Sequence, residues 1–203
     1  MAELDRQVGA SADDARGYWT GAAWTFAADN IHQNAGYYTA SVYKIGGGMR
    51  FTNITIPKGY IIINAYITLT CRNSRSGTVV RTKIRGEDAD NPSAFSDYSD
   101  YSGRPRTSAE VNWDNIPAWT ADTEYDSPDI KTVIQEIIGR AGWSSGNALV
   151  IFWDDHDDRS DHNAEAFRDG QSYDGSSSKA PKLHIEYTPP ATGGARSYCY
   201  IMG

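Results

Sequence analysis

The sequence has few cysteines and no long apolar run. Its 203 residues include only Cys71 and Cys199, whose spacing matches neither a zinc knuckle nor a redox pair. We expect Cys71, at an apolar strand position, to be a buried thiol, with a disulfide between the two cysteines as the alternative. No segment reaches the roughly 18 consecutive apolar residues that a membrane-spanning helix needs. We therefore expect no membrane partner.

Basic residues are also too few for a general nucleic-acid binder. Lys and Arg number 19 against 26 Asp and Glu, which gives a net charge of −7. Phosphate binding needs a basic face, and the basic-rich stretches 72–85 and 104–106 are interrupted by polar residues. The first residues are polar and lack the apolar core of a secretion signal. We expect no nucleic-acid partner, and a location in a virion or outside the cell after release without a cleaved signal.

Motifs of the common catalytic classes are missing as well. The sequence has no G-x-S-x-G, P-loop or H-E-x-x-H pattern. The glycines at 46–48 precede an apolar strand pattern instead of leading into a helix, so they do not predict a phosphate cradle. We expect a protein that is not an enzyme. A polysaccharide-active enzyme is the least favoured alternative, because glycosidases need two carboxyl groups in separate environments.

What the sequence does contain is a strong strand pattern. Apolar and polar residues alternate over eleven residues of "IIINAYITLTC", a period of two that is typical of a half-buried strand. Further strands are predicted in 49–56, 78–88, 147–153 and 181–189, and only a short one (109–113) in the long connection 88–126. The inward face of the first strand is predicted to carry Ile61, Ile63, Ala65, Ile67, Leu69 and Cys71.

One helix is predicted in "SPDIKTVIQEIIGRAGW", starting at residue 127. Ser127 is a candidate N-cap, Pro128 suits the first helical position and Gly139 can end the helix. The spacing i, i+3, i+4, i+7, i+8 indicates one buried stripe, made of Ile130, Val133, Ile134, Ile137 and Ile138.

Together these patterns predict a mainly β protein, an antiparallel jelly-roll β-sandwich with one short amphipathic helix. Residues 1–16 are expected to be an N-terminal arm, 17–190 a single sandwich domain and 191–203 a C-terminal tail. An exposed apolar tail needs a partner. The residues expected to mediate assembly are Tyr198, Tyr200, Ile201 and Met202.

Three segments resemble a known family. They are "GMRFTNITIPKGYIIINAYITLT", "SPDIKTVIQEIIGRAGWSSGNALVIF" and "KAPKLHIEY", which are similar to DNRLRE-type (disaggregatase-related) modules of bacterial and archaeal surface proteins and of phage-encoded proteins. The resemblance covers roughly residues 48–188. It implies a jelly-roll module without a general catalytic triad, of which some relatives bind polysaccharide. It says more about fold than about function.

The acidic stretch "FWDDHDDRSDHNAEAFRDG" (152–170) is a candidate metal site. Calcium binds six to eight oxygen ligands, often from one loop, but the spacing here matches no EF-hand, and zinc prefers His and Cys. We interpret the stretch as a solvent-facing excursion between two strands, with no cofactor, and keep calcium as the alternative. Its candidate ligands are Asp154, Asp155, Asp157, Asp158 and Asp161.

Aromatic residues of the long connection are candidates for sugar stacking, namely Trp113, Trp119, Tyr98 and Tyr101. Packing of the connection onto the sheet is the more common role of such rings. The leading functional hypothesis is a structural, assembling phage virion component (capsid decoration, tail or fibre), a homo-oligomer or one subunit of a larger particle. The alternative is a carbohydrate-binding module of a surface protein, with a surface glycan as partner.

Overall fold

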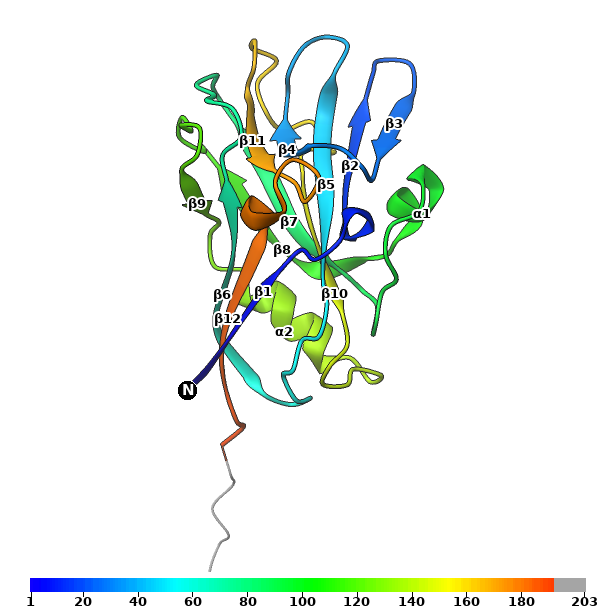
Figure 1. Cartoon of the computed structure of the whole chain (residues 1–203), viewed down its shortest axis with the longest axis vertical. Coiled ribbons are helices and arrows are strands. Elements are labelled where there is room, and N and C mark those ends of the chain that lie inside the picture. Colours follow the sequence, from blue (N-terminus) through cyan, green and yellow to red (C-terminus); the bar gives the residue numbers. More distant parts are fainter. Residues whose placement is uncertain (192–203) are drawn as a thin grey trace, which may run out of the picture.

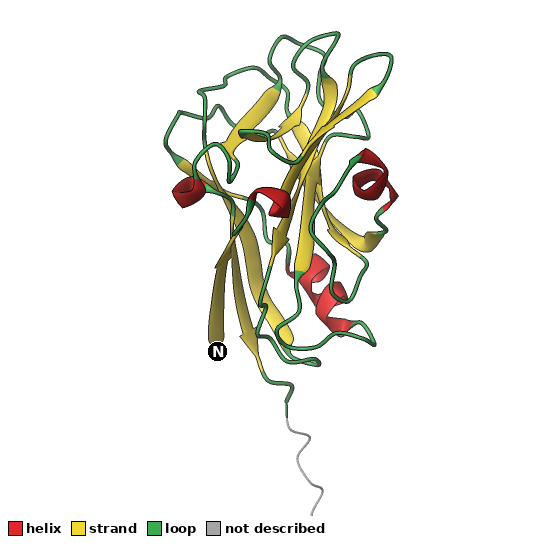
Figure 2. Ribbon diagram, turned by 45° about the vertical axis from the view of Figure 1, so that its right-hand side comes forward, coloured by secondary structure: helices red, strands yellow, loops and turns green. Residues whose placement is uncertain are grey.

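The computed structural model describes residues 1–191 and shows a mainly β protein whose strand pairs are all antiparallel (Figures 1 and 2). The smaller sheet has four strands in the order β1 (Ala2–Gln7), β12 (Lys182–Thr188), β6 (Ile61–Thr70) and β9 (Glu124–Asp126). The larger sheet runs in the order β11 (Phe167–Gln171), β4 (His32–Gly36), β5 (Tyr43–Phe51), β10 (Leu149–Asp154), β7 (Arg81–Glu87) and β8 (Arg106–Asp114). Off this path, β2 (Asp14–Trp19) pairs with β5 and with β3 (Trp24–Ala27).

Short helices complete the structure. They are α1 (Tyr98–Gly103), α2 (Lys131–Gly139) and the 3-10 turns η1 (Ser11–Asp13) and η2 (Ser177–Lys179). No helix within residues 1–191 is long and apolar enough to cross a membrane. The predicted antiparallel, mainly β fold is confirmed, while its jelly-roll connectivity stays a prediction.

The main core lies between the two sheets and is closed by α2 (Figure 1). The predicted helical stripe is confirmed, because all five of its residues are fully buried. The start of the helix is later than predicted, at Lys131. Ser127 is not the N-cap: its hydroxyl accepts the amide of Ile67 at 3.1 Å, and Asp129 accepts those of Ala65 and Lys131. These bonds attach the segment before α2 to β6.

A bulge changes the inward face of β6. Its pairing with β12 shifts by one residue, so that Asn64 and Ile62 oppose neighbouring residues of β12 and Ile63 is the extra residue. Ala65 to Cys71 keep the predicted alternation, but Ile62 is buried instead of Ile61 and Ile63. The prediction that Ile61 and Ile63 face the core is therefore wrong.

The far face of the larger sheet is covered as well. The connection 88–126, expected to be largely irregular, contains the nine-residue β8 and the helix α1. Its Phe95 and Tyr101 pack with Ala15, Val150 and Phe152 in a second apolar cluster. Strand β10 is consequently buried at all six positions, as expected for a strand covered on both faces.

The N-terminal residues are not an arm. Six of them form β1, which pairs with β12 from Ala2↔Tyr187 to Gln7↔Lys182, and the chain then continues into β2 within the larger sheet. Leu4 anchors β1 because it is buried in the main core.

The four assembly residues predicted at 198–202, and Cys199, lie outside the described residues. The other cysteine, Cys71, is buried as predicted.

Glycines let β5 pack closely on both faces. A Cβ atom at Gly48 would overlap the ring of Phe95, and one at Gly47 would overlap the side chain of Gln33. Interior glycines usually weaken strands, so their presence here reflects the close approach of these neighbours.

We expect Gly48→Ala to lower the free energy of unfolding by about 1–3 kcal/mol, because Phe95 must move in a packed cluster. Gly139→Ala is the matched control: nothing lies within 4 Å of a Cβ there, and we expect a change within about 1 kcal/mol. Denaturant unfolding of both variants measures the difference. Equal stability of the two variants would contradict the packing described here.

Candidate functional site

The acidic stretch 152–170, which begins within β10, is tied to β7 by ion pairs. The three outward-facing cations of β7 each take one of its carboxylates: Arg85 with Asp154 at 3.2 Å, Lys83 with Asp157 at 2.7 Å and Arg81 with Asp161 at 3.0 Å. The hydrogen bond from Lys83 holds the pKa of Asp157 below its usual range.

The other two candidate calcium ligands also have partners. Asp155 is buried, and its oxygens accept the amides of Arg159 at 2.6 Å and Ser160 at 3.1 Å. Burial raises the pKa of Asp155 to about 6. Asp158 contacts His162 at 2.8 Å. Within residues 1–191 no three acidic, His or Cys side chains are grouped to hold a metal ion, so the structure gives the calcium hypothesis no support.

Part of this stretch is not solvent-facing. Asp154 and Asp155 are each 1% exposed, and residues 167–171 form β11. The expected excursion is therefore shorter than predicted, and its acidic residues fasten it to the sheet.

The predicted sugar platform is not an exposed surface. Trp119 is 2% exposed and stacks on Tyr125, with ring centroids 4.7 Å apart and planes at 6°. Trp113 packs against Trp119 and Trp153 in the main core. Tyr101 is the buried residue of α1, and only Tyr98 is partly exposed. The rings pack the connection onto the sheet, so Trp113, Trp119 and Tyr101 are not available to a saccharide.

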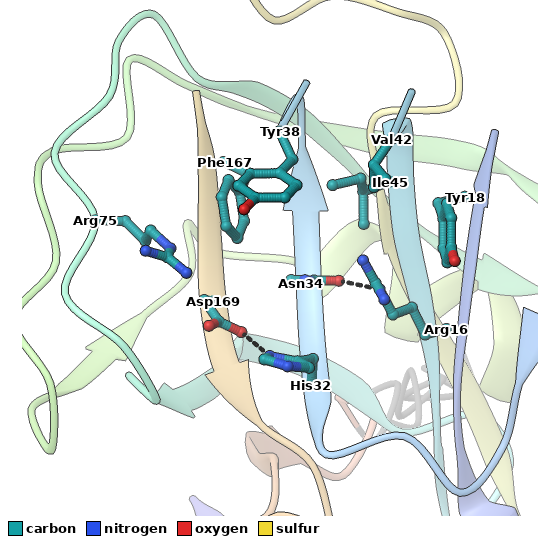
Figure 3. Close-up of a pocket in the computed structure, with 10 residues that line it drawn as sticks. All are labelled: Arg16, Tyr18, His32, Asn34, Tyr38, Val42, Ile45, Arg75, Phe167 and Asp169. Atoms are coloured by element: carbon teal, nitrogen blue, oxygen red, sulfur yellow. Dashed lines mark hydrogen bonds and ion pairs between the residues drawn. The ribbon is translucent and has the colours of Figure 1, made fainter. Parts of the chain in front are cut away.

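A pocket of about 280 Å³ lies elsewhere, on β4 and β11 and beside β2 (Figure 3). Strand β4 pairs with β11 over five residues but with β5 only through Gly36 and Ile45. Because side chains alternate along a strand, His32 and Asn34 of β4 share a face with Phe167 and Asp169 of β11. The lining comprises Arg16, Tyr18, His32, Asn34, Tyr38, Val42, Ile45, Arg75, Phe167 and Asp169.

A buried carboxylate orients the histidine of the pocket. Asp169 is fully buried, and its two oxygens contact His32 Nδ1 at 2.7 Å and Asn73 Nδ2 at 2.7 Å. The contact with Asp169 takes up Nδ1, and Nε2 is the ring nitrogen that Asp169 does not engage. The His32 side chain is 28% exposed.

Two guanidinium groups lie over aromatic rings in the pocket. Arg16 lies 4.4 Å from the centroid of Tyr18 and donates from Nε to Asn34 Oδ1 at 2.9 Å. Arg75 lies 4.7 Å from the centroid of Phe167. Two backbone hydrogen bonds fix Arg75 to Trp119. The amide of Arg75 donates to the carbonyl oxygen of Trp119 at 2.9 Å, and the amide of Trp119 donates to the carbonyl oxygen of Arg75 at 2.8 Å. Stacking on a ring restricts each guanidinium and adds a cation–π attraction.

Arg168, on the opposite face of β11, holds the segments behind the pocket. Its side chain is fully buried and donates to the carbonyl oxygens of Gly77 at 3.0 Å, Ile116 at 2.6 Å, Pro117 at 2.6 Å and Phe167 at 2.8 Å. No carboxylate of the described chain pairs with it. Burial lowers the pKa of Arg168 to about 10.

Sequence reasoning missed this pocket because its residues are spread over five segments. Arg16 fell within the expected arm, and Asp169 within the expected excursion. Both strands are short and mix polar residues with glycine, in "HQNAG" and "FRDGQ", without a regular alternation of apolar and polar positions. No periodic signal in the sequence therefore identifies these strands or shows that they pair.

We expect Arg168→Met to lower the free energy of unfolding by about 3–5 kcal/mol, because several buried carbonyl groups lose their donor. Arg81→Met is the matched control, since the Arg81 side chain is 39% exposed and its ion pair contributes at most about 1 kcal/mol. Urea unfolding followed by tryptophan fluorescence measures both. If Arg168→Met were as stable as Arg81→Met, the hydrogen bonds from Arg168 to the four carbonyl groups would not be needed for stability.

No family model matches this chain, and no curated protein matches it. The resemblance to DNRLRE-type modules accordingly stays a prediction from sequence, and function has to be inferred from the pocket and surface of the chain itself.

Proposed function

We propose that the chain is a non-catalytic saccharide-binding module and that the pocket on β4, β11 and β2 is its binding site. The observation that supports this is the combination of aromatic rings with fixed planar donors in one concavity (Figure 3). Tyr18, Tyr38 and Phe167 supply the rings. Small-ligand sites are typically concave and apolar with a few placed polar groups, and this pocket of about 280 Å³ combines apolar and aromatic side chains with such groups.

The polar groups favour binding over catalysis. Asp169 is the one carboxylate in the lining, and both of its oxygens are engaged by His32 and Asn73. Glycosidases use two carboxyl groups across the scissile bond. The lining also includes no Ser, Thr, Cys or Lys that could serve as a nucleophile. The proposal therefore keeps the carbohydrate hypothesis but moves it from the 88–126 connection to this pocket.

Tyr38→Ala should weaken binding about three- to tenfold on a saccharide array, because a ring that contacts the ligand face is removed. Tyr38 is 38% exposed, so the change should leave the unfolding temperature almost unaltered. Tyr66→Ala, on β6 of the other sheet, is the matched control and should bind like the parent protein. Failure of the parent protein to bind any saccharide, or equal binding by Tyr38→Ala, would count against the proposal.

Assembly into a larger particle is a second candidate, supported by exposed apolar residues at one end of the smaller sheet. Met1 is 81% exposed, Ile61 44% and Ile63 37%. Ile61 pairs with Thr188 on β12, and Ala2 pairs with the adjacent Tyr187, so the three apolar side chains lie at the same end. Exposed apolar groups of this kind mark contact sites. They support a virion component, released with the particle, in which this end contacts another copy or another subunit.

The double variant Ile61→Ser/Ile63→Ser should shift the protein from oligomer to monomer in light scattering, because the apolar contact is lost. The double variant Glu124→Ser/Lys182→Ser removes an exposed ion pair of 2.6 Å on the same sheet and should leave the mass unchanged. A parent protein that stays monomeric at high concentration, or a serine variant with the parent's mass, would exclude self-assembly through this end.

A further inference from the structure

The pocket is positively charged although the chain has a net charge of −7. Its charged and basic lining consists of Arg16, Arg75, His32 and Asp169. The one negative charge, on Asp169, is buried and already bonded to His32 and Asn73. Arg75 has a carboxylate nearby, Glu165, at 3.5 Å, but that side chain is 47% exposed and therefore well solvated.

Arg16 is the least compensated of these charges. Among residues 1–191 its side chain makes one hydrogen bond, from Nε to Asn34 Oδ1 at 2.9 Å, and no salt bridge. Figure 3 shows its terminal nitrogens directed into the pocket. Burial lowers the pKa of Arg16, while Tyr18 and Asp169 raise it to a lesser extent. A partly buried cation without a counter-charge costs free energy, and an anion placed against the terminal nitrogens would offset that cost.

The geometry of Arg16 selects the shape of that anion. The planar guanidinium is held by its ring contact with Tyr18 and by Asn34, so its orientation is set before a ligand arrives. A fixed guanidinium donates two parallel hydrogen bonds to a planar or tetrahedral oxyanion. Figure 3 shows Arg75 on the opposite side of the pocket, where it adds attraction at longer range.

We infer that the ligand of this pocket is an anionic saccharide, whose carboxylate or sulfate group binds Arg16 while its sugar ring contacts the aromatic lining. This inference rests on the proposed saccharide-binding function and specifies the ligand. A neutral sugar fills the same space but leaves the guanidinium uncompensated. Discrimination between anionic and neutral sugars then follows from one charged hydrogen-bonded pair, which corresponds to about ten- to a hundredfold in affinity.

Calorimetric titration with matched sugars tests the inference. The probes are glucuronic acid, its neutral amide, glucose, and glucose sulfate, together with an array of acidic and neutral oligosaccharides. We expect at least one anionic member to bind about ten- to a hundredfold more tightly than its neutral counterpart. Carboxylate and sulfate probes distinguish the two kinds of anion. Arg16→Gln should remove this preference, because it weakens the binding of the acidic sugars more than that of the neutral sugars.

Two controls separate a specific site from general attraction. Arg16→Lys keeps the charge but not the two-pronged donor, and should recover only part of the preference. Arg81→Gln removes a cation outside the pocket lining and should bind like the parent protein. Unfolding temperatures of all variants check that each remains folded.

The possible outcomes are distinct for the two proposals. Equal affinity for anionic and neutral sugars, or an unchanged preference in Arg16→Gln, would overturn the inference and leave the saccharide-binding function standing. Displacement of bound acidic sugar by an equal concentration of inorganic sulfate would also overturn it, since the sugar ring would then add nothing. Absence of binding to any saccharide would overturn the proposed function itself.

Discussion

The guanidinium of Arg168 is the interaction on which the pocket depends. A buried cation without a carboxylate is costly, and here the compensation comes from four backbone carbonyl groups. Those carbonyls belong to β11 and to the segments around Gly77 and Ile116, whose backbones otherwise meet through isolated bridges, Arg75–Trp119 and Cys71–Gly170, and not through a strand ladder. By joining them, Arg168 fixes the connection that carries Arg75 and the strand that carries Phe167 and Asp169. Arg168, on the inner face of β11, thus helps to fix the position of the pocket residues Phe167 and Asp169 on its outer face.

The acidic stretch illustrates a different use of charge. Carboxylates that lie close together repel one another, and a bound metal ion is one way to compensate this repulsion. Here the alternating cations of β7 provide another, because Arg81, Lys83 and Arg85 lie at every second position and each takes one aspartate. The spacing of a β-strand therefore organises the loop beside it. This explains why so many carboxylates occur together without forming a cluster.

The sequence was informative where one face of an element is apolar. The strands around Ile67, Ile84 and Ile185 and the stripe of α2 were predicted because alternation and helical spacing report burial directly. Polar strands were missed: β4 and β11 carry His32, Asn34 and Asp169, whose role depends on a partner strand more than 130 residues away. The bulge at Ile63 was missed for a similar reason. It depends on how β6 pairs with β12, and local pattern does not contain that information.

The sparse pairing between β4 and β5 has a mechanical consequence. Gly36 and Ile45 form their single ladder pair, whereas β4 and β11 are paired over five residues and β2 is firmly paired with β5. The two walls of the pocket are therefore joined by that single pair, by the hairpin between β4 and β5, and by the bond between Arg16 and Asn34. Across this part of the sheet a side-chain contact supplements a backbone ladder that is almost absent. Arg16 consequently has two roles, as part of the pocket lining and as a link between its walls.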